Sequence, residues 1–418
     1  MNGDTDKNLE IEEEDSKQQK FSSFAYVILF VVFFTGIVFC WSQYKVTAVI
    51  PTIITDLNIS AAAAGWIMGA FNLCGVILAF PGLILLRKWG VKKAGLIAVV
   101  VGAIGTILGY FANEEILLIG SRVIEGFGIG MISVIAPTVI TMWFPLKKRG
   151  FPMGLWSSWQ MVAVAAAFLF SIGISNAFGT WKGMWIVGII LFVVAFVLYA
   201  LFVKSPPDNQ NYADSEDTSV KLTSVLKYAS PWIVCIGGLG FGIACTVFVT
   251  WVATFWITMG GLDLATANNF IVLVFVGEIV WCIVAGLALN KIRRRRYFIV
   301  VAAVLYAIVY FLAFTLHTFP GIVFVVVTYA LIEGCFTAAM WTLIGQTVPD
   351  YRLTGGAIAM YTIAINLGMV IGAPLAGALV DMGSWTGVAI LSCVTQLVAA
   401  IAFAALKLYD EKGRVAKI

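Results

Sequence analysis

The decapeptide SRVIEGFGIG, residues 121–130, places an arginine and a glutamate three positions apart inside a long apolar stretch. Its central tripeptide returns in the second half of the chain as Ile332, Glu333 and Gly334, again among apolar residues. Charged groups are costly inside a lipid bilayer, so an ionisable side chain in a membrane span faces the protein interior, a partner or a water-filled cavity. The recurring carboxylate therefore predicts a duplicated membrane unit with a polar interior.

The composition predicts an integral membrane protein that lies in the lipid bilayer. Of the 418 residues, 61% are hydrophobic and only 11% are charged, and the mean hydropathy is +0.98. Soluble domains carry about a quarter charged residues. The acidic N-terminal run EIEEED is unlike the start of a cleaved signal peptide, so we expect the first hydrophobic segment to be retained. The seven cysteines are odd in number and lack CxxC spacing, which predicts neither a disulfide framework nor a metal site.

Twelve apolar stretches are long enough to cross a bilayer as helices, the only open-ended structure that satisfies its own backbone in lipid. We place them at about 24–47, 61–86, 92–112, 116–143, 152–174, 183–204, 231–259, 267–290, 297–316, 321–347, 356–380 and 385–406.

The distribution of Lys and Arg predicts the direction of these spans. If both termini are cytoplasmic, all but three of the 26 basic residues lie on the cytoplasmic side, the exceptions being Lys45, Arg122 and Lys182. Positive loops stay on the cytoplasmic face of a membrane. We therefore expect cytoplasmic N- and C-termini in a multi-pass protein of the plasma membrane, which in a bacterium is the inner membrane.

Sequence markers recur in the same order in the two halves. GTWKG at 179–183 matches GSWTG at 383–387, and basic clusters occupy residues 85–93 and 290–296. The ordered set predicts an all-α fold of two pseudo-symmetric six-helix bundles, with a solute site where they meet. The expected parts are a cytoplasmic tail (1–22), an N-terminal bundle (23–204), a cytoplasmic linker (205–230), a C-terminal bundle (231–406) and a second tail (407–418).

The chain resembles the major facilitator superfamily of secondary transporters along nearly its whole length. The family's fourth-span motif, R-x-x-Q-G-x-G, is matched by Arg122, Gly126 and Gly128, with Glu125 in place of glutamine. Its loop motif, P-x-G-x-L-x-D-R-x-G-R-R, is similar to FPGLILLRKWGVKK at 80–93, where Pro81, Lys88, Gly90 and Lys92 fit. The resemblance implies the twelve-helix fold and transport of a small solute driven by a gradient.

The chain departs from the family at three motifs. Arg87 stands where the loop motif has aspartate, and Asn290 takes the acidic position in the second copy of that loop. The resemblance gives this loop the role of latching helices on the cytoplasmic side, so these changes weaken the expected latch. The fifth-span signature of the antiporters, G-x-x-x-G-P-x-x-G-G, is missing, and a similar run, GMVIGAPLAG at 368–377, appears only in the eleventh span.

The ionisable residues within spans are the candidates for ion pairing and proton coupling. Arg122 and Glu125 share a helical face, which allows them to pair with each other or with Lys45, and a purely structural salt bridge is the alternative. Glu278 and Glu333 have no basic residue within a helical turn, and low dielectric favours the protonated form of an isolated carboxyl. We assign proton coupling to Glu125, Glu278 and Glu333. The alternative for the last two is a protonated acid bonded to a backbone carbonyl.

A second set of polar and aromatic residues is the candidate substrate site. Lys45 near the end of the first span resembles the substrate-binding arginine of anion-carrying branches of the family, although a lysine there also suits snorkelling toward headgroups. Core packing is the alternative for the tryptophans. The full set is Gln43, Tyr44, Lys45, Arg122, Trp156, Trp159, Gln160, Trp281 and Trp341.

These features together predict a secondary transporter of a small carboxylate, coupled to protons by symport. No Walker A motif occurs, so energy must come from a gradient. The alternatives are a proton-coupled exporter of hydrophobic or cationic compounds and a solute sensor that transports nothing. The single histidine, His317, has no nucleophile and base beside it, so we expect no enzyme, no cofactor and no nucleic-acid partner. We expect a monomer whose partners are solute, protons and lipid.

Overall fold

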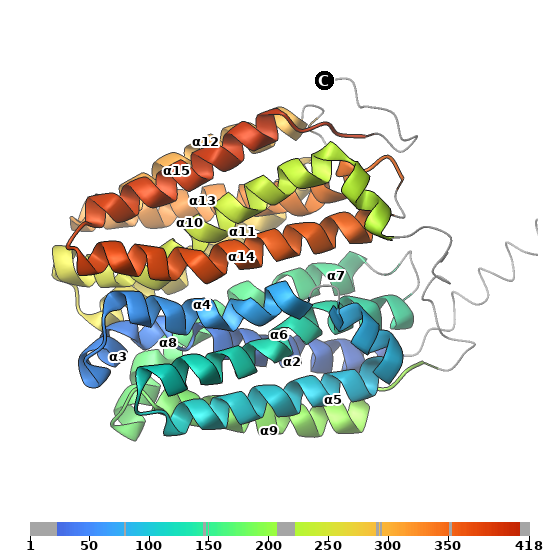
Figure 1. The fold of residues 1–418 in the computed structure, drawn as a ribbon, viewed down its shortest axis with the longest axis horizontal. Helices are drawn as coiled ribbons and strands as arrows, with labels where there is room; N and C mark the ends of the chain where they lie inside the picture. Colours follow the sequence, from blue (N-terminus) through green and yellow to red (C-terminus); the bar gives the residue numbers. More distant parts are fainter. Residues whose placement is uncertain are drawn as a thin grey trace, which may run out of the picture.

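The computed structural model describes residues 23–78, 81–144, 148, 150–206, 222–289, 292, 295–350 and 353–409. These form two stacked helical bundles, one from each half of the chain (Figure 1). The predicted tail at 1–22, residues 410–418 of the predicted tail at 407–418, most of the predicted linker, Asn290 and most of the basic run at 290–296 lie outside the described residues, as does the side chain of Arg87.

The helices follow the chain in the predicted order. The first half contains α2 (Phe24–Tyr44), the 3₁₀ turn η1 (Thr47–Val49), α3 (Ile50–Leu57), α4 (Ala61–Leu78), α5 (Pro81–Phe111), α6 (Glu115–Trp143), α7 (Gly150–Ser157), α8 (Trp159–Phe178) and α9 (Gly183–Phe202). The second half contains η4 (Leu222–Lys227), α10 (Ala229–Gly260), α11 (Leu264–Leu289), α12 (Arg295–Ala313), α13 (Phe319–Ile344), η5 (Gly345–Thr347), α14 (Thr354–Asp381) and α15 (Trp385–Ala404).

The described residues contain twelve helical stretches long and apolar enough to cross a membrane, which confirms the predicted number of spans. Three boundaries differ from the prediction because the helices break. The first span runs on to Leu57 after a break that follows Tyr44. The loop expected after residue 86 is a kink at Gly90, whose φ of 71° requires a residue without a side chain. The fifth span is interrupted at Ser158.

The two halves repeat each other at the turns of one end of the molecule. Helix α8 is capped by Gly179 with φ 67°, and the equivalent turn after α14 contains Gly383 with φ 71°. These are the glycines of the GTWKG and GSWTG repeats. We call this end, at the left of Figure 1, the far end. The shared left-handed turns support the predicted pseudo-symmetry, because only glycine adopts this conformation without strain.

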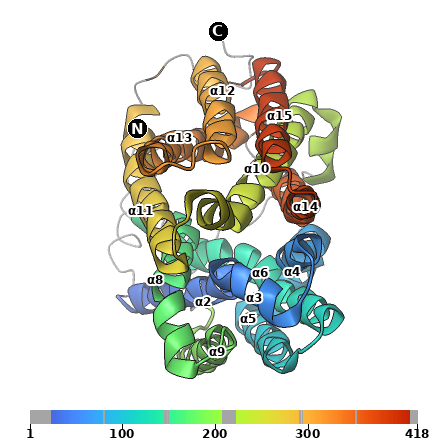
Figure 2. The same ribbon diagram turned by 90° about the vertical axis from the view of Figure 1, so that its left-hand side faces the viewer.

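Two helix pairs join the bundles. Helix α4 lies beside α14, and α8 lies beside α11 (Figure 2). A side chain at Gly65 of α4 would place its Cβ 2.5 Å from the carbonyl oxygen of Ala373 on α14. The absence of side chains at such positions lets the two backbones approach closely, as in other membrane helix pairs.

The repeated tripeptide occupies equivalent packing positions in the two bundles. Gly126 of α6 lies directly against the backbone of Phe71 on α4. In the second bundle, a Cβ on Gly334 of α13 would lie 2.7 Å from the backbone nitrogen of Cys282 on α11. Each glycine therefore lets its helix pack closely against a neighbouring helix. This close packing sets the position of the preceding glutamate along the bundle.

Candidate substrate and coupling sites

The break that ends α2 creates an acceptor site inside the first bundle. The chain leaves the helix at Tyr44 and resumes as η1, so the carbonyl groups of Ser42 and Gln43 are free to accept bonds from elsewhere. Arg122 of α6 donates to both of them, over 2.6 Å and 2.8 Å from its two terminal nitrogens. A third bond, from Nε, reaches the carbonyl of Ile67 on α4 over 3.2 Å.

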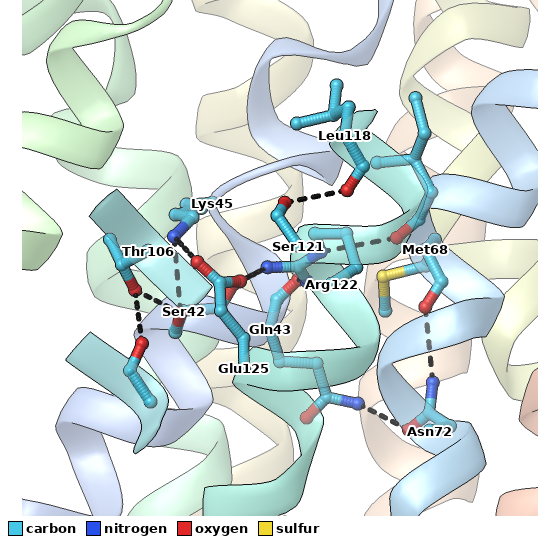
Figure 3. Close-up of polar contacts among 12 residues, drawn as sticks. Ser42, Gln43, Lys45, Met68, Asn72, Thr106, Leu118, Ser121, Arg122 and Glu125 are labelled. Carbon is cyan, nitrogen blue, oxygen red and sulfur yellow. Dashed lines mark hydrogen bonds and ion pairs between the residues drawn. The ribbon is translucent and has the colours of Figure 1, made fainter. Parts of the chain in front are cut away.

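Glu125 lies between two buried cations (Figure 3). Its Oε1 accepts a bond from Nζ of Lys45 at 2.6 Å, and its Oε2 accepts one from Arg122. The side chains of all three residues are completely buried. The predicted pairing of Arg122 with Glu125, and of Glu125 with Lys45 across the first span, is thus confirmed. We call these three residues the charge triad.

The remaining contacts of the triad hold its cations in place. The ammonium group of Lys45 donates to Oγ of Ser42 over 3.2 Å and lies 4.7 Å from the centre of the Trp185 ring. The guanidinium of Arg122 lies 4.5 Å from the centre of the Phe71 ring. Cations attract the faces of aromatic rings, most strongly where water is excluded. The triad carries two positive charges and one negative charge in a nonpolar interior.

Amide groups extend the site from the triad to α4. The side chain of Gln43 donates over 2.9 Å to Oδ1 of Asn72, while its own Oε1 has no hydrogen-bond partner among the described residues. The predicted site does not contain Ser42, Asn72 or Trp185. A signal for Asn72 did exist, because it is an amide inside an otherwise apolar span. None existed for Trp185, which depends on the packing of α9.

Glu278 on α11 and Glu333 on α13 form the polar part of the second bundle, and we call them the acid pair. Both are buried, and Oε2 of each has no hydrogen-bond partner among the described residues. The carbonyl oxygen of Glu278 would lie 3.0 Å from a Cβ on Gly334, so the two helices touch at the level of the acids. An unpaired buried polar group costs about 1–3 kcal/mol, which a structural core normally avoids.

Tyr44 belongs to the first bundle and interacts electrostatically with acids of the second. It follows Gln43 and precedes Lys45 in the first bundle, and its hydroxyl lies within electrostatic range of Glu278 and Glu333 in the second. The acids therefore lie near the contact between the halves. The structure brings four of the predicted polar residues together (Gln43, Lys45, Arg122 and Glu125), and Tyr44 lies beside them in the chain.

The aromatic candidates fall into two groups. Trp156 and Trp159 stack at 4.8 Å between ring centres and are buried, beside Gly36 of α2. Gln160, which the helical spacing places on the same face, is exposed instead, because the break at Ser158 changes the register of the helix. Trp281 and Trp341 are 37% and 54% exposed and belong to neither the triad nor a buried stack. Their part in substrate binding stays a prediction.

Hydrogen bonds join the two bundles at the far end. The carboxylate of Asp381, at the end of α14, accepts bonds from the backbone N–H groups of Ala61 and Ala62 at 2.7 Å and 2.9 Å. These groups begin α4, where the helix dipole attracts a negative charge. The amide of Asn268 on α11 donates over 2.9 Å to the carbonyl of Ala48 and over 2.9 Å to Oγ of Ser171. The far end is thus closed by contacts from both bundles.

Comparison with known proteins agrees with this architecture. The family model described as Major Facilitator Superfamily matches residues 32–353 and 261–418. The chain belongs to the Major Facilitator Superfamily. Members of this family are membrane transporters, so the protein is a multi-pass membrane protein of the transporter class.

Its relatives among characterised proteins are distant. A hexuronate transporter of Bacillus subtilis (strain 168) is 25% identical over 88% of this chain and 90% of its own length. A probable sulfoacetate transporter of Cupriavidus necator is 22% identical, covering 60% of this chain and 62% of its own length. A galactose-proton symporter of Escherichia coli (strain K12) is 24% identical over 45% of this chain and 40% of its own length.

Solved structures confirm the fold. A bacterial homologue of the lysosomal transporter Spinster, in an inward-facing and unoccupied conformation, superimposes with a TM-score of 0.76 at 15% identity, over 96% of this chain and 100% of that chain. A D-xylose-proton symporter gives a TM-score of 0.74 at 17% identity, over 94% and 100%. At this level of identity the likeness concerns the arrangement of helices alone.

Proposed function

We propose that the protein carries a small organic carboxylate together with a proton across the plasma membrane by alternating access. The observation that carries this proposal is the presence of two unlike polar sites, one in each bundle. The charge triad in the first bundle has one excess positive charge, and the acid pair in the second has no cationic partner among the described residues. One site suits an anionic solute and the other suits a proton.

The excess charge of the triad favours an anion. Lys45 and Arg122 share the single carboxylate of Glu125. In a medium of low dielectric an unbalanced charge acts strongly over several ångströms. Arg122 is already committed to three backbone carbonyls, so Lys45 is the cation free to exchange partners. A carboxylate that enters beside Tyr44 would compete with Glu125 for the Lys45 ammonium group.

The names of two relatives support a carboxylate or another organic anion. Hexuronate and sulfoacetate, which give their names to the transporters from B. subtilis and C. necator, are both anions, and galactose is transported by its relative with protons. All three relatives are transporters rather than enzymes, which agrees with the expected absence of catalysis. We therefore infer symport of an anion with protons through Glu278 and Glu333.

The far-end contacts support a proposal for the side that the site faces and for the steps of the transport cycle. With the termini in the cytoplasm, the far end faces outward, and the bonds of Asp381 and Asn268 close that side. These contacts support an inward-facing arrangement of the site. Protonation of the acid pair and binding of the anion would together neutralise both bundles and permit the change to the outward-open state.

Uptake into proteoliposomes tests the proposal. The purified chain is reconstituted, a pH gradient is imposed, and a panel of hexuronates, sulfoacetate, small monocarboxylates, neutral sugars and amines is screened. We expect accumulation of at least one carboxylate, stimulated when the outside is acidic. Accumulation of amines against a proton gradient would instead identify an exporter of cations, and transport of neutral sugars alone would overturn the role of the triad.

A further inference from the structure

The interior of the second bundle contains an unusual group of buried polar atoms. Side-chain oxygens or nitrogens on five helices lack a hydrogen-bond partner among the described residues: those of Thr246, Thr250, Glu278, Tyr306, Tyr310, Tyr329, Glu333 and Gln396. Buried polar groups in native proteins are nearly always satisfied, by protein or by ordered water. Their concentration within one bundle indicates an interior that holds water in the working protein.

Three tyrosines form the centre of this group. The rings of Tyr306 and Tyr310 on α12 stack at 4.3 Å, and the ring of Tyr329 on α13 lies 5.2 Å and 5.6 Å from them. All three side chains are fully buried. Tyr329 and Glu333 are four residues apart and share one face of α13, so the carboxyl group continues the row of hydroxyls.

We propose that Tyr306, Tyr310 and Tyr329 enclose a hydrated proton-holding site with Glu333, in which their hydroxyls position the carboxyl group and the water beside it. This assignment rests on the proposed proton coupling and adds three residues to it. The tyrosines act as positioning residues, since Glu333 takes up and releases the proton.

The chemistry of the surroundings agrees with a proton rather than a larger cation or an anion. Seven ionisable groups that interact with Glu333 are weak acids: Tyr44, Cys245, Glu278, Cys282, Tyr306, Tyr310 and Tyr329. A hydroxyl both donates and accepts a hydrogen bond. A water held by a tyrosine oxygen can therefore deliver a proton to Glu333 while the tyrosine keeps its own O–H proton and stays neutral.

The first bundle contains a matched control. Tyr199 is also fully buried, but its hydroxyl donates over 3.0 Å to the backbone carbonyl of Val91. Replacing any of these tyrosines by phenylalanine removes one oxygen and keeps the ring, so the packing is preserved. Tyr199→Phe loses a hydrogen bond to the backbone, whereas the three variants of the second bundle lose hydroxyl groups that interact with Glu333.

Infrared spectroscopy of the purified protein tests the assignment without a substrate. The carbonyl stretch of a protonated carboxyl that disappears in Glu333→Gln is followed during a pH titration. We expect this band to move to higher frequency in Tyr329→Phe and Tyr306→Phe, because a carboxyl that accepts fewer hydrogen bonds has a stiffer C=O bond. The band should be unchanged in Tyr199→Phe. An identical band in all the tyrosine variants would overturn the proposal, as would loss of the band on adding Na⁺.

Transport supplies the second readout. Uptake driven by a pH gradient should fall about tenfold in Tyr329→Phe, the equivalent of one hydrogen bond to a charged group, while exchange at equal pH stays as in the wild type. Equal losses in both assays would indicate a structural role and would contradict the proposal. If no carboxylate is transported at all, the proposed function fails, but the infrared result still decides whether the tyrosines hold a protonated Glu333.

Discussion

Glu125 and Glu333 occupy the same place in the two halves of the molecule and have opposite surroundings. Each precedes a glycine that presses its helix against a neighbour, α4 in the first bundle and α11 in the second. Glu125 is held by Lys45 and Arg122, whereas Glu333 faces tyrosines and a second acid. Duplication has thus preserved the packing of the motif while its electrostatic role diverged.

The divergence has a simple origin in the sequence. Three residues before Glu125 stands Arg122, and three residues before Glu333 stands Ala330. With no arginine on the same face, the second glutamate lacks the ion pair that Glu125 forms with Arg122. We propose that the unpaired Glu333 takes up and releases the proton, and the predicted role of Glu125 in coupling stays a prediction.

The largest expected effect is on stability. Glu125→Gln leaves two buried cations without a counter-charge, which we expect to cost about 3–5 kcal/mol of unfolding free energy. Glu333→Gln, the matched variant in the other bundle, should leave the stability nearly unchanged. Denaturant unfolding in detergent measures both. Similar losses in the two variants would show that the glutamates are equivalent after all.

Exchanging the partners sharpens this prediction. In the double variant Arg122→Glu, Glu125→Arg, the ion pair can re-form, but the carbonyls of Ser42 and Gln43 lose the donors that Arg122 supplied. We therefore expect only partial recovery of the stability lost in Glu125→Gln. Full recovery would mean that these backbone bonds contribute little.

The second effect concerns coupling. Glu333→Gln should reduce uptake driven by a pH gradient by about a hundredfold, a typical loss when a proton-transfer group is removed. Glu278→Gln is tested beside it, because the acids interact. Counterflow of labelled solute at equal pH separates coupling from binding. Normal pH dependence in both variants would refute proton coupling through the acid pair.

The third effect concerns the affinity for an anion. Lys45→Met removes the excess positive charge of the triad, and we expect the affinity for a carboxylate to fall about tenfold, as for the loss of one charge-assisted hydrogen bond. Lys182→Met is the control, since Lys182 is bonded to Asn113 at the far end, outside the triad. Binding is measured by calorimetry. An unchanged affinity would remove Lys45 from the substrate site.

The fourth effect concerns the closed far end. Asp381→Asn replaces a carboxylate that accepts hydrogen bonds from two backbone N–H groups of α4. We expect the closed state to lose about 1 kcal/mol of stability relative to the open state. Distances between spin labels attached at Thr55→Cys and Met382→Cys report opening. We expect a larger fraction of long distances in the variant. An unchanged distribution would show that the charge of Asp381 does not hold the far end closed.

The smallest expected effect concerns how strongly the stability of each bundle depends on pH, through the residue that caps a helix in each. Asp263 begins α11, where the hydroxyl and backbone N–H of Thr266 donate to its carboxylate and hold its pKa below the ordinary value of 3.8. The equivalent residue before α4 is Ser60, whose Oγ accepts the N–H of Ala63. A lowered pKa means stability that is present above pH 4 and is lost as the pH falls through the folded value.

Asp263→Ser should remove this acid-sensitive contribution while keeping a cap. Thermal unfolding between pH 3 and pH 6 compares the variant with the wild type. We expect the two to differ in slope below about pH 4 and to agree above it. A parallel dependence on pH would show that the cap of α11 does not titrate.

Much of the architecture was predictable because the bilayer restricts the possible structures. The twelve spans, the repeat marked by the two glycine turns and the pairing of Arg122 with Glu125 all follow from local features of the chain. The breaks after Tyr44 and at Gly90 and Ser158 were less accessible. A helix break within an apolar stretch depends on partners elsewhere in the fold, such as the carbonyl acceptors that Arg122 fills.

By itself, the sequence determined which residues cross the membrane, where the halves repeat and which side chains carry charge into the interior, because apolar length and the cost of burying charge act locally. Only the tertiary structure decided which partners surround each buried charged group. The partners of Glu125 come from α2 and α6, those of Glu333 come from α11, α12 and α13, and these helices meet through packing that no single segment encodes.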